Sequence, residues 1–588
     1  MKARLLAGAL ATALLVAGCA TVPTKGPIRN SSQDAPAPGL GGIGVEARPP
    51  RPNAPQQQLV NGFVEAMSDS NAFDVAREYM TPEAGDAWKP ESKILVYDQS
   101  SSSGIAREAD GKFHLSAPLI ATIDSRGSWA PAPSDTQLDF AFDLTKVGDQ
   151  WRVANPPPGV FLGSNQLVPR LTPYALYFFN PSKHLMVPDP VYLPRNLPSG
   201  QAATQLIQEL LKGPTTRLGN SVVSNAPPGT TVDVSVPVES GVATVALSGT
   251  ASSLTDATDR EQLAAQITWT LQPITTRVRI TVEGAPLLPD RPEELSYHDF
   301  TQYDPAVPSG RLKDLYGVRA GRIQRIQGQD DGQTIEAKPI ADSQLYPFRA
   351  ESFAVNLHGE TGAVVSTSKA GRPIVVVGRL DAPKAETPPS VIEADGKVLR
   401  PSFDGEDNLW ILDRADSAKP RLRVRTADGK VSNVLTSFGA NRLVVLRMAP
   451  DGVRALLVME RNGVNSVMTA SVASSDGKPA LGRFMPLQLP LVDITDATWN
   501  NPGILLAGSS PKRDGARPWQ VNVDGSQPQV IPGASSSFET IHVASNPNHD
   551  TLPAVQDAQK QLHWQGKDLN WVDMAEGPEG LITPVYPG

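Results

Sequence analysis

The 588-residue sequence contains one cysteine, Cys19, so it can form neither an intramolecular disulfide bond nor a cysteine-based structural metal site. It has no cluster of Lys and Arg residues and carries a formal net charge of −8, which argues against nucleic acid as a partner. No apolar run reaches the roughly 20 residues that a membrane-spanning helix needs. The folded chain must therefore be stabilised by burial of apolar side chains, and its length is sufficient for about three or four domains.

Motifs of catalysis are also missing. The sequence has no HExxH, no GxSxG and no Walker A motif, and no two histidines have the i, i+4 spacing of metal ligands on a helix. The seven histidines are His114, His184, His298, His358, His542, His549 and His563. We therefore predict no metal site, no cofactor and no enzymatic activity. One alternative is that Asp404, Asp407 and Asp413, which lie at predicted turns, supply the acid and base of a glycosidase. Asp residues at such turns more commonly cap backbone groups.

The N-terminus has the pattern of a signal peptide. Lys2 and Arg4 precede an apolar stretch from Leu5 to Val16, which is too short to cross a bilayer. The stretch ends in Val-Ala-Gly-Cys at Cys19, which resembles the bacterial lipobox. This resemblance implies a signal peptide over 1–18, cleavage before Cys19, and acylation of Cys19 including palmitate. We therefore predict that acyl chains on Cys19 hold the protein in the lipid bilayer, at the outer face of the cytoplasmic membrane.

Proline and glycine are abundant, with 55 and 48 residues, and favour turn-rich β structure over long helices. Residues 19–57 are especially rich in Pro, Gly, Ala, Ser and Gln and cannot bury enough apolar surface to offset the entropy of ordering. This composition predicts a lipidated, semi-extended tether.

Residues 58–160 predict a first α+β domain. Apolar residues recur at helical spacing from Val60 through Phe63 and Val64 to Met67, and Asp74 to Met80 predicts a second helix. Later, apolar residues alternate from Leu138 to Leu144 and predict a strand, with Trp151 and Val153 in its hairpin partner. The end of this segment is similar to the last hairpin of NTF2-like domains.

Residues 165–290 predict a second α+β domain. The predicted elements are a strand over 174–179, a helix over 203–211, a hairpin over 232–238 and 242–247, a helix over 263–271 and a strand over 278–282. Gly213-Pro214 stops the first of these helices. The Leu210–Pro214 helix end and the Val278–Gly284 strand resemble the GerMN domain, an extracytoplasmic module without enzyme chemistry.

Residues 291–310 are again proline-rich and predict a linker, after which a loose repeat fills 311–588. Its apolar landmarks lie about 45 to 50 residues apart, which is typical of the blades of a β-propeller. They are Phe353, Phe403, Met448, Trp499 and Val543. Five repeats are visible, and 311–340 could supply another. An irregular pair of β-sandwiches is the alternative. The predicted fold class is thus multidomain, with two α+β domains followed by an all-β propeller.

Taken together, the lipobox, the tether, the two α+β segments and the propeller resemble the actinobacterial LpqB lipoprotein family across essentially the whole chain. The resemblance implies an accessory factor of the MtrA–MtrB two-component system, which contacts the extracytoplasmic domain of the sensor kinase and affects cell-envelope homeostasis. We therefore predict a non-enzymatic interaction protein. A lipoprotein that binds cell-wall glycan, and less plausibly a propeller hydrolase, are the alternatives.

Overall fold

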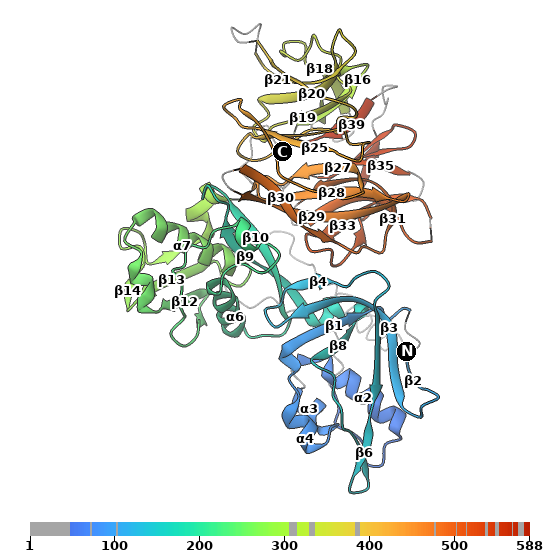
Figure 1. Cartoon of the computed structure of the whole chain (residues 1–588). Helices are drawn as coiled ribbons and strands as arrows, with labels where there is room; N and C mark the ends of the chain where they lie inside the picture. The colour runs from blue at the N-terminus through green and yellow to red at the C-terminus, as the bar shows by residue number, and fades with distance from the viewer. Residues whose placement is uncertain are drawn as a thin grey trace, which may run out of the picture. The chain divides into compact units, whose positions relative to one another are not determined.

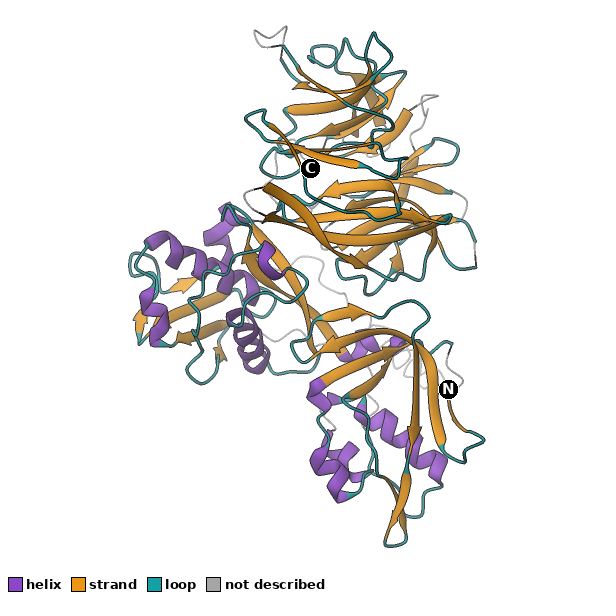
Figure 2. Ribbon diagram, in the orientation of Figure 1, coloured by secondary structure: helices purple, strands orange, loops and turns teal. Residues whose placement is uncertain are grey.

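The computed structural model describes residues 47–588 apart from 71–72, 102–103, 305–313, 329–334, 383–387, 476–477, 501–502, 513, 535–538, 547, 549–551, 567–568 and 574–580. The described chain contains two α+β domains followed by a domain of strands alone, so the predicted fold class is confirmed. Figure 2 shows helices in the first two domains and only strands and loops in the last. Cys19 and the signal peptide lie outside the described residues.

The first domain opens with three helices, α2 (Gln56–Met67), α3 (Phe73–Glu78) and α4 (Pro82–Ala87). The predicted apolar face of α2 is confirmed, because its buried residues are Leu59, Val60, Phe63, Ala66 and Met67. The sequence analysis missed α4. Its start is specified locally: the Thr81 side chain accepts a hydrogen bond from the backbone N–H of Ala84, and Pro82 occupies the first turn.

A six-stranded sheet packs against these helices (Figure 1). Its strands are β1 (Lys93–Tyr97), β2 (Ile105–Arg107), β3 (Phe113–Asp124), β4 (Trp129–Pro131), β5 (Gln137–Phe142) and β8 (Val160–Gly163). The long β3 pairs with β1, β2, β4 and β5, and β1 pairs in parallel with β8. In the core between helix and sheet, the rings of Phe63 and Phe142 meet edge to face at 6.3 Å.

The alternating run from Leu138 to Leu144 is two strands rather than the single strand predicted. At Asp143 the backbone leaves the ladder, because its N–H donates to Asn155 Oδ1 at 2.6 Å. β5 stays in the main sheet, whereas β6 (Leu144–Val147) forms the predicted hairpin with β7 (Gln150–Val153). The alternation of apolar and polar residues continues across the break at Asp143, so the sequence pattern does not indicate where one strand ends and the next begins.

The last part of the predicted tether is packed on the first domain. Ala47 contacts its hydrophobic core, and the Tyr79 hydroxyl donates a hydrogen bond to the carbonyl of Arg48 at 2.6 Å. Helix α2 already begins at Gln56, inside the segment 19–57. The end of this segment could not be predicted to be packed, because only a few contacts hold it and its composition is that of the rest of the tether.

The second domain is built around α6 (Ser199–Leu211) and α7 (Ala257–Leu271), as the sequence predicts. Gly213 adopts a φ of +86° just beyond α6, which explains a glycine at this helix end. The other elements are α5 (Leu167–Arg170), β9 (Leu171–Phe179), β10 (Met186–Pro194), β11 (Val238–Glu239), β12 (Val242–Leu247), β13 (Arg277–Val282), β14 (Ala285–Pro286) and β15 (Glu294–Leu295). β9 and β10 form a hairpin, and β12 pairs in parallel with β13.

The strand predicted over Val232 to Val238 is wrong for most of its length. Only the two residues of β11 and an isolated bridge from Val232 to Leu247 pair with β12, while Val234 is 86% exposed. The backbone N–H of Val236 instead donates to the Thr204 hydroxyl of α6 at 2.8 Å, and Pro237 has no N–H to offer a ladder. The two ends of the predicted strand therefore pair with β12, whereas the residues between them do not form a ladder.

The predicted linker over 291–310 also contains part of this domain. β15 pairs with β13, and short 3₁₀ turns follow over Tyr297–Tyr303. Leu295 and Phe300 are buried in the same core as α6 and α7. Proline content indicated a linker, but two apolar side chains fix the segment to the domain.

The described residues of the last domain form six four-stranded antiparallel sheets. In chain order, the innermost strands of the second to sixth sheets are β19 (Ser352–Val355), β23 (Ser402–Phe403), β27 (Arg442–Met448), β31 (Val492–Trp499) and β35 (Thr540–Ala544). The middle strands are β20 (Thr361–Thr367), β21 (Pro373–Arg379), β24 (Leu409–Asp413), β25 (Arg421–Arg425), β28 (Arg454–Arg461), β29 (Val464–Ser475), β32 (Gly503–Ser509), β33 (Ala516–Asn522), β36 (Ala554–Asp557) and β37 (Leu562–Gln565). The outermost strands are β22 (Ser390–Glu393), β26 (Val431–Asn433), β30 (Lys478–Pro486), β34 (Gln529–Val530) and β38 (Trp571–Asp573).

The first sheet closes the ring. It contains β16 (Leu315–Arg319), β17 (Arg322–Gly328) and β18 (Ile335–Pro339), and its innermost strand is β39 (Leu581–Val585) from the far end of the domain. Each innermost strand contacts the next, from β19 round to β39 and back to β19, and a separate hydrophobic core fills each interface between blades. The domain is therefore a closed six-bladed propeller, and the sandwich alternative is excluded.

The repeat landmarks are confirmed as equivalent positions. Phe353, Phe403, Met448, Trp499 and Val543 all lie on innermost strands of successive blades. The Asp-Gly pairs at 428–429, 451–452 and 524–525 lie in turns that join adjacent strands, with each glycine at positive φ. Asp395-Gly396 instead lies in the connection between the second and third blades.

Candidate functional site

The aspartates that could form a catalytic pair are used to build the third blade. Asp404 is 3% exposed, and its Oδ1 accepts hydrogen bonds from the backbone N–H groups of Glu406 and Asn408. Its Oδ2 accepts a hydrogen bond from Trp410 Nε1 at 2.9 Å. Asp404 therefore caps the β23–β24 turn and anchors the neighbouring indole, as the non-catalytic interpretation expects.

Asp413 is buried in a cluster of arginines at the end of β24. The Arg421 Nε and Arg423 Nη2 atoms each lie 2.9 Å from its carboxylate oxygens. The backbone N–H of Asp395 also donates to it, at 3.3 Å. The third candidate, Asp407, accepts a hydrogen bond from Asn356 Nδ2 at 2.8 Å, so the three aspartates serve three separate arrangements and do not form an acid–base pair.

Burial raises the pKa of Asp404 to about 6, although its hydrogen bonds oppose the shift. Because this exceeds the pKa of an unfolded aspartate, the native state takes up a proton between about pH 6 and pH 4 while the unfolded state does not. We therefore expect the free energy of unfolding of the wild type to rise as the pH falls through this window, by at most about 3 kcal/mol relative to Asp404→Asn. Chemical denaturation of both proteins at several pH values measures this difference.

The matched control for that prediction is Asp428→Asn, in the β25–β26 turn. Hydrogen bonds from Thr426 and Lys430 lower the pKa of Asp428, so this variant cannot reproduce the expected trend. Stability curves for wild type and Asp404→Asn that stay parallel from pH 7 to pH 4 would show that Asp404 does not change its protonation in the native state.

A second cluster of charged side chains connects three successive innermost strands. Arg447 Nη2 lies 3.3 Å from Asp496 Oδ1, and His542 Nδ1 lies 3.2 Å from Asp496 Oδ2. Burial and the nearby charge of Arg400 lower the pKa of Arg447 to about 9. Burial opposes ionisation of Asp496, but the hydrogen bond with His542 and the charges of Arg447 and Arg400 hold its pKa below the ordinary value. This group links the fourth, fifth and sixth blades.

The sequence analysis missed this group, yet the sequence contains a signal for it. Arg447 and Asp496 are 49 residues apart, and Asp496 and His542 are 46 residues apart, which is the spacing of the blade repeat. Charged residues at blade spacing lie at equivalent positions on neighbouring innermost strands and can therefore meet. Among the described residues, no group of three or more His, Cys, Asp or Glu side chains has an arrangement that could hold a metal ion.

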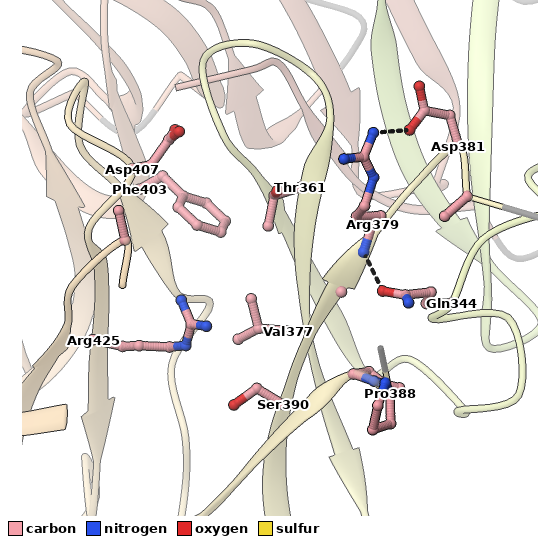
Figure 3. A pocket seen from close by; sticks show the side chains of 14 residues that line it. Gln344, Thr361, Val377, Arg379, Asp381, Pro388, Ser390, Phe403, Asp407 and Arg425 are labelled. Carbon is pink, nitrogen blue, oxygen red and sulfur yellow. Dashed lines mark hydrogen bonds and ion pairs between the residues drawn. The ribbon is translucent and has the colours of Figure 1, made fainter. Parts of the chain in front are cut away.

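A cavity of about 770 Å³ opens between the second and third blades (Figure 3). The second blade contributes Thr361, Val377, Arg379, Asp381 and Ser390, and the third contributes Phe403, Asp407 and Arg425. Gln344, in the segment before β19, accepts a hydrogen bond from the backbone N–H of Arg379 at 2.8 Å. Both charged and apolar side chains therefore face one space of the size that binds small ligands or short peptide segments.

The charges of this cavity are not all paired. Arg379 Nη2 lies 3.4 Å from Asp381 Oδ1, whereas no carboxylate lies within ion-pair distance of Arg425 among the described residues. Arg425 Nη1 donates to the carbonyl of Thr426 at 3.3 Å, and its buried Nε has no acceptor. This cavity is the arrangement best suited to binding that we find in the described part of the propeller.

No helix in the described part of the chain combines the length and apolarity needed to cross a bilayer. Cys19, the predicted site of lipidation, falls outside the described residues, so its modification stays a prediction from sequence.

Three family models match the chain. Residues 49–168 match the N-terminal domain of Lipoprotein LpqB, 175–288 match a domain described as "Sporulation and spore germination", and 329–587 match the Lipoprotein LpqB beta-propeller domain. The matches cover both α+β domains and the propeller.

Curated relatives match over the whole length. The chain is 29% identical to Lipoprotein LpqB of Streptomyces coelicolor, over 100% of the chain and 98% of the relative. It is 27% identical to Lipoprotein LpqB of Thermobifida fusca over 100% of both, and 25% identical to that of Mycobacterium tuberculosis over 98% and 97%. These names describe a lipoprotein and not an enzyme.

Among solved structures, TolB from Acinetobacter baumannii is 12% identical and covers 60% of the chain and 88% of its own, with a TM-score of 0.36. That TM-score is too low to support an inference about function.

Proposed function

The chain belongs to the LpqB lipoprotein family, and on this premise we propose that it is a lipid-anchored, non-enzymatic accessory protein of a two-component sensor kinase. Its partner is the extracytoplasmic domain of a kinase of the MtrB type, and its place is the outer face of the cytoplasmic membrane. The partner and the role in envelope homeostasis come from the resemblance to the family.

The non-enzymatic part of the proposal is supported by the structural roles of the candidate aspartates. Asp404 and Asp413 are saturated by hydrogen bonds and ion pairs within the third blade, so neither is available to a substrate. The propeller instead offers a fixed ring of loops and a cavity with mixed charge. Such a surface suits binding of another protein.

The lipid anchor supports a membrane-bound partner. Acyl chains at Cys19 confine the protein to the surface in which a sensor kinase is embedded, which raises the effective concentration of each for the other without any added contact. A weak interface is then sufficient for association in the cell, although it is harder to detect in dilute solution.

The test is direct binding between the purified lipidated protein in detergent and the extracytoplasmic domain of the sensor kinase. We expect saturable binding with a dissociation constant below about 100 µM, in the range of a transient signalling contact. The extracytoplasmic domain of an unrelated sensor kinase serves as the control. Equal binding of both domains, or no binding of either at high concentration, would contradict the proposal.

A further inference from the structure

Two opposite charges in the cavity between the second and third blades have no ion-pair partner among the described residues. The Arg425 side chain donates a hydrogen bond to the carbonyl of Thr426, and its buried Nε has no acceptor among the described residues. Asp407 accepts one hydrogen bond from Asn356 at Oδ1, and no cation lies within ion-pair distance of it. Partly buried charges without a counter-ion are costly, so a ligand that supplies both counter-charges would be stabilised here.

The apolar lining near these two charges differs in its exposure. In Figure 3 the ring of Phe403 is drawn between Asp407 and Arg425, but Phe403 is 1% exposed and Val377 is 4% exposed, so both belong to the core between the blades. Pro388 is exposed and Pro389 is half-buried, and both line the cavity beside the outer strand. The cavity thus presents an anion, a cation and an apolar lining that a ligand reaches at the two prolines.

The outermost strand of the second blade borders the same cavity. β22 begins at Ser390, which lines the cavity, and β22 is the last strand in its sheet, so one edge of its backbone has no strand partner within the described part of the chain. Val391, the next residue, is 52% exposed. An open strand edge beside side-chain pockets is the arrangement that receives an extended peptide as an added strand.

We propose that this cavity binds an extended peptide segment of the partner protein, with a carboxylate side chain on Arg425 and an apolar side chain against Pro388 and Pro389. A basic side chain of the same segment pairs with Asp407. This inference rests on the proposed function, because the segment is taken to belong to the extracytoplasmic domain of the sensor kinase.

Other ligand classes fit the lining less well. A phosphate group would meet the carboxylates of Asp407 and Asp381 as well as the two arginines. A neutral glycan would leave the charges of Arg425 and Asp407 unpaired, and no Trp or Tyr is present among the described side chains that line the cavity. Only a peptide combines both charges, apolar side chains and a backbone that can pair with β22.

The experiment measures binding of two probes to the full-length lipidated protein in detergent. The first probe is the extracytoplasmic domain of the sensor kinase, and the second is a set of short synthetic peptides that tile this domain. Each is tested against wild type, Arg425→Gln, Arg425→Lys and the control Arg372→Gln. Arg372 is exposed in the β20–β21 turn of the second blade and is not among the residues that line the cavity. Thermal unfolding checks that all variants are folded.

We expect at least one peptide to bind, and Arg425→Gln to weaken that peptide and the domain about tenfold or more. Arg425→Lys retains the positive charge and should keep most of the affinity, and Arg372→Gln should have no effect. Replacement of the acidic residue of the bound peptide by its amide should weaken binding to wild type and have little further effect on Arg425→Gln.

The outcomes separate the two proposals. If the domain binds wild type and Arg425→Gln equally, or binds while no tiled peptide does, the cavity is not the site and only this inference is overturned. If the domain does not bind wild type at all, the proposed function itself is overturned.

Discussion

Replacing Cys19 with alanine is expected to move the protein from the membrane fraction to the soluble fraction and to prevent lipidation. The thiol is the nucleophile for the thioether bond, and no other cysteine in the chain can take its place. Each buried acyl methylene contributes about 0.8 kcal/mol, so loss of the acyl chains removes essentially the whole membrane affinity of an acidic domain. Mass spectrometry of the mature protein and fractionation of cells that process lipoproteins measure the effect.

The control is Ser32→Ala, a replacement of another small polar residue in the segment that follows Cys19. It should leave the acylated mass and the membrane fraction unchanged. Wild type that is soluble and unmodified, with Cys19→Ala indistinguishable from it, would refute the lipid anchor and remove the main physical reason for a membrane-bound partner.

The second large effect is expected from Asp413→Ala, which should reduce the free energy of unfolding of the propeller by about 3–5 kcal/mol. Asp413 is 0% exposed and is the shared acceptor of Arg421 and Arg423. Its removal leaves the Arg423 guanidinium, whose side chain is 11% exposed, without a counter-ion inside the blade. Hydrogen exchange of peptides from β24 and β25 reports this loss for the propeller alone.

Asp395→Ala provides the comparison within the same cluster. The Asp395 side chain is 56% exposed and pairs with Arg414 and Arg421 at the surface. Exposed ion pairs contribute little, so we expect a much smaller loss than for Asp413→Ala. If the two variants change exchange equally, the burial of Asp413 is not what makes its ion pairs important for stability.

The sequence predicts the propeller well because its repeat reports directly on packing. Phe353, Phe403 and Met448 recur because each innermost strand must fill the same kind of interface with the next blade. Helices α6 and α7 are predictable for a similar reason, since their apolar faces cover the core of the second domain. In both cases the packing requires apolar residues at regular intervals, and this pattern can be recognised in the sequence.

Other features of the fold produce no recognisable pattern of apolar residues. Val232 to Val238 alternates like a strand, but only its two ends pair with β12, and between them the N–H of Val236 donates to Thr204 of α6. The proline-rich segment after residue 290 is held by Leu295 and Phe300, which are too few to form a pattern. In both places tertiary contacts outweigh local composition.

The candidate cavity could not be predicted at all. Asp407 lies in the β23–β24 turn and Arg425 at the end of β25, both in the third blade, whereas Val377 comes from the second, so the three meet only once two blades have packed together. Even after closure of the ring is known, whether a given arginine finds a carboxylate depends on side-chain positions. That Arg425 has no carboxylate partner among the described residues can therefore be learned only from the structure.

The pairing of β39 with β16 has a consequence for biosynthesis. The predicted signal peptide would bring the chain across the membrane from its N-terminus, and β16 would then be outside without its inner neighbour until nearly all of the remaining blades have emerged. During that interval β16 presents an unpaired edge, of the kind that favours wrong strand pairing and aggregation. Completion of translocation and completion of the fold would thus coincide, and a chain arrested before Leu581 would leave its first blade open to envelope proteases and chaperones.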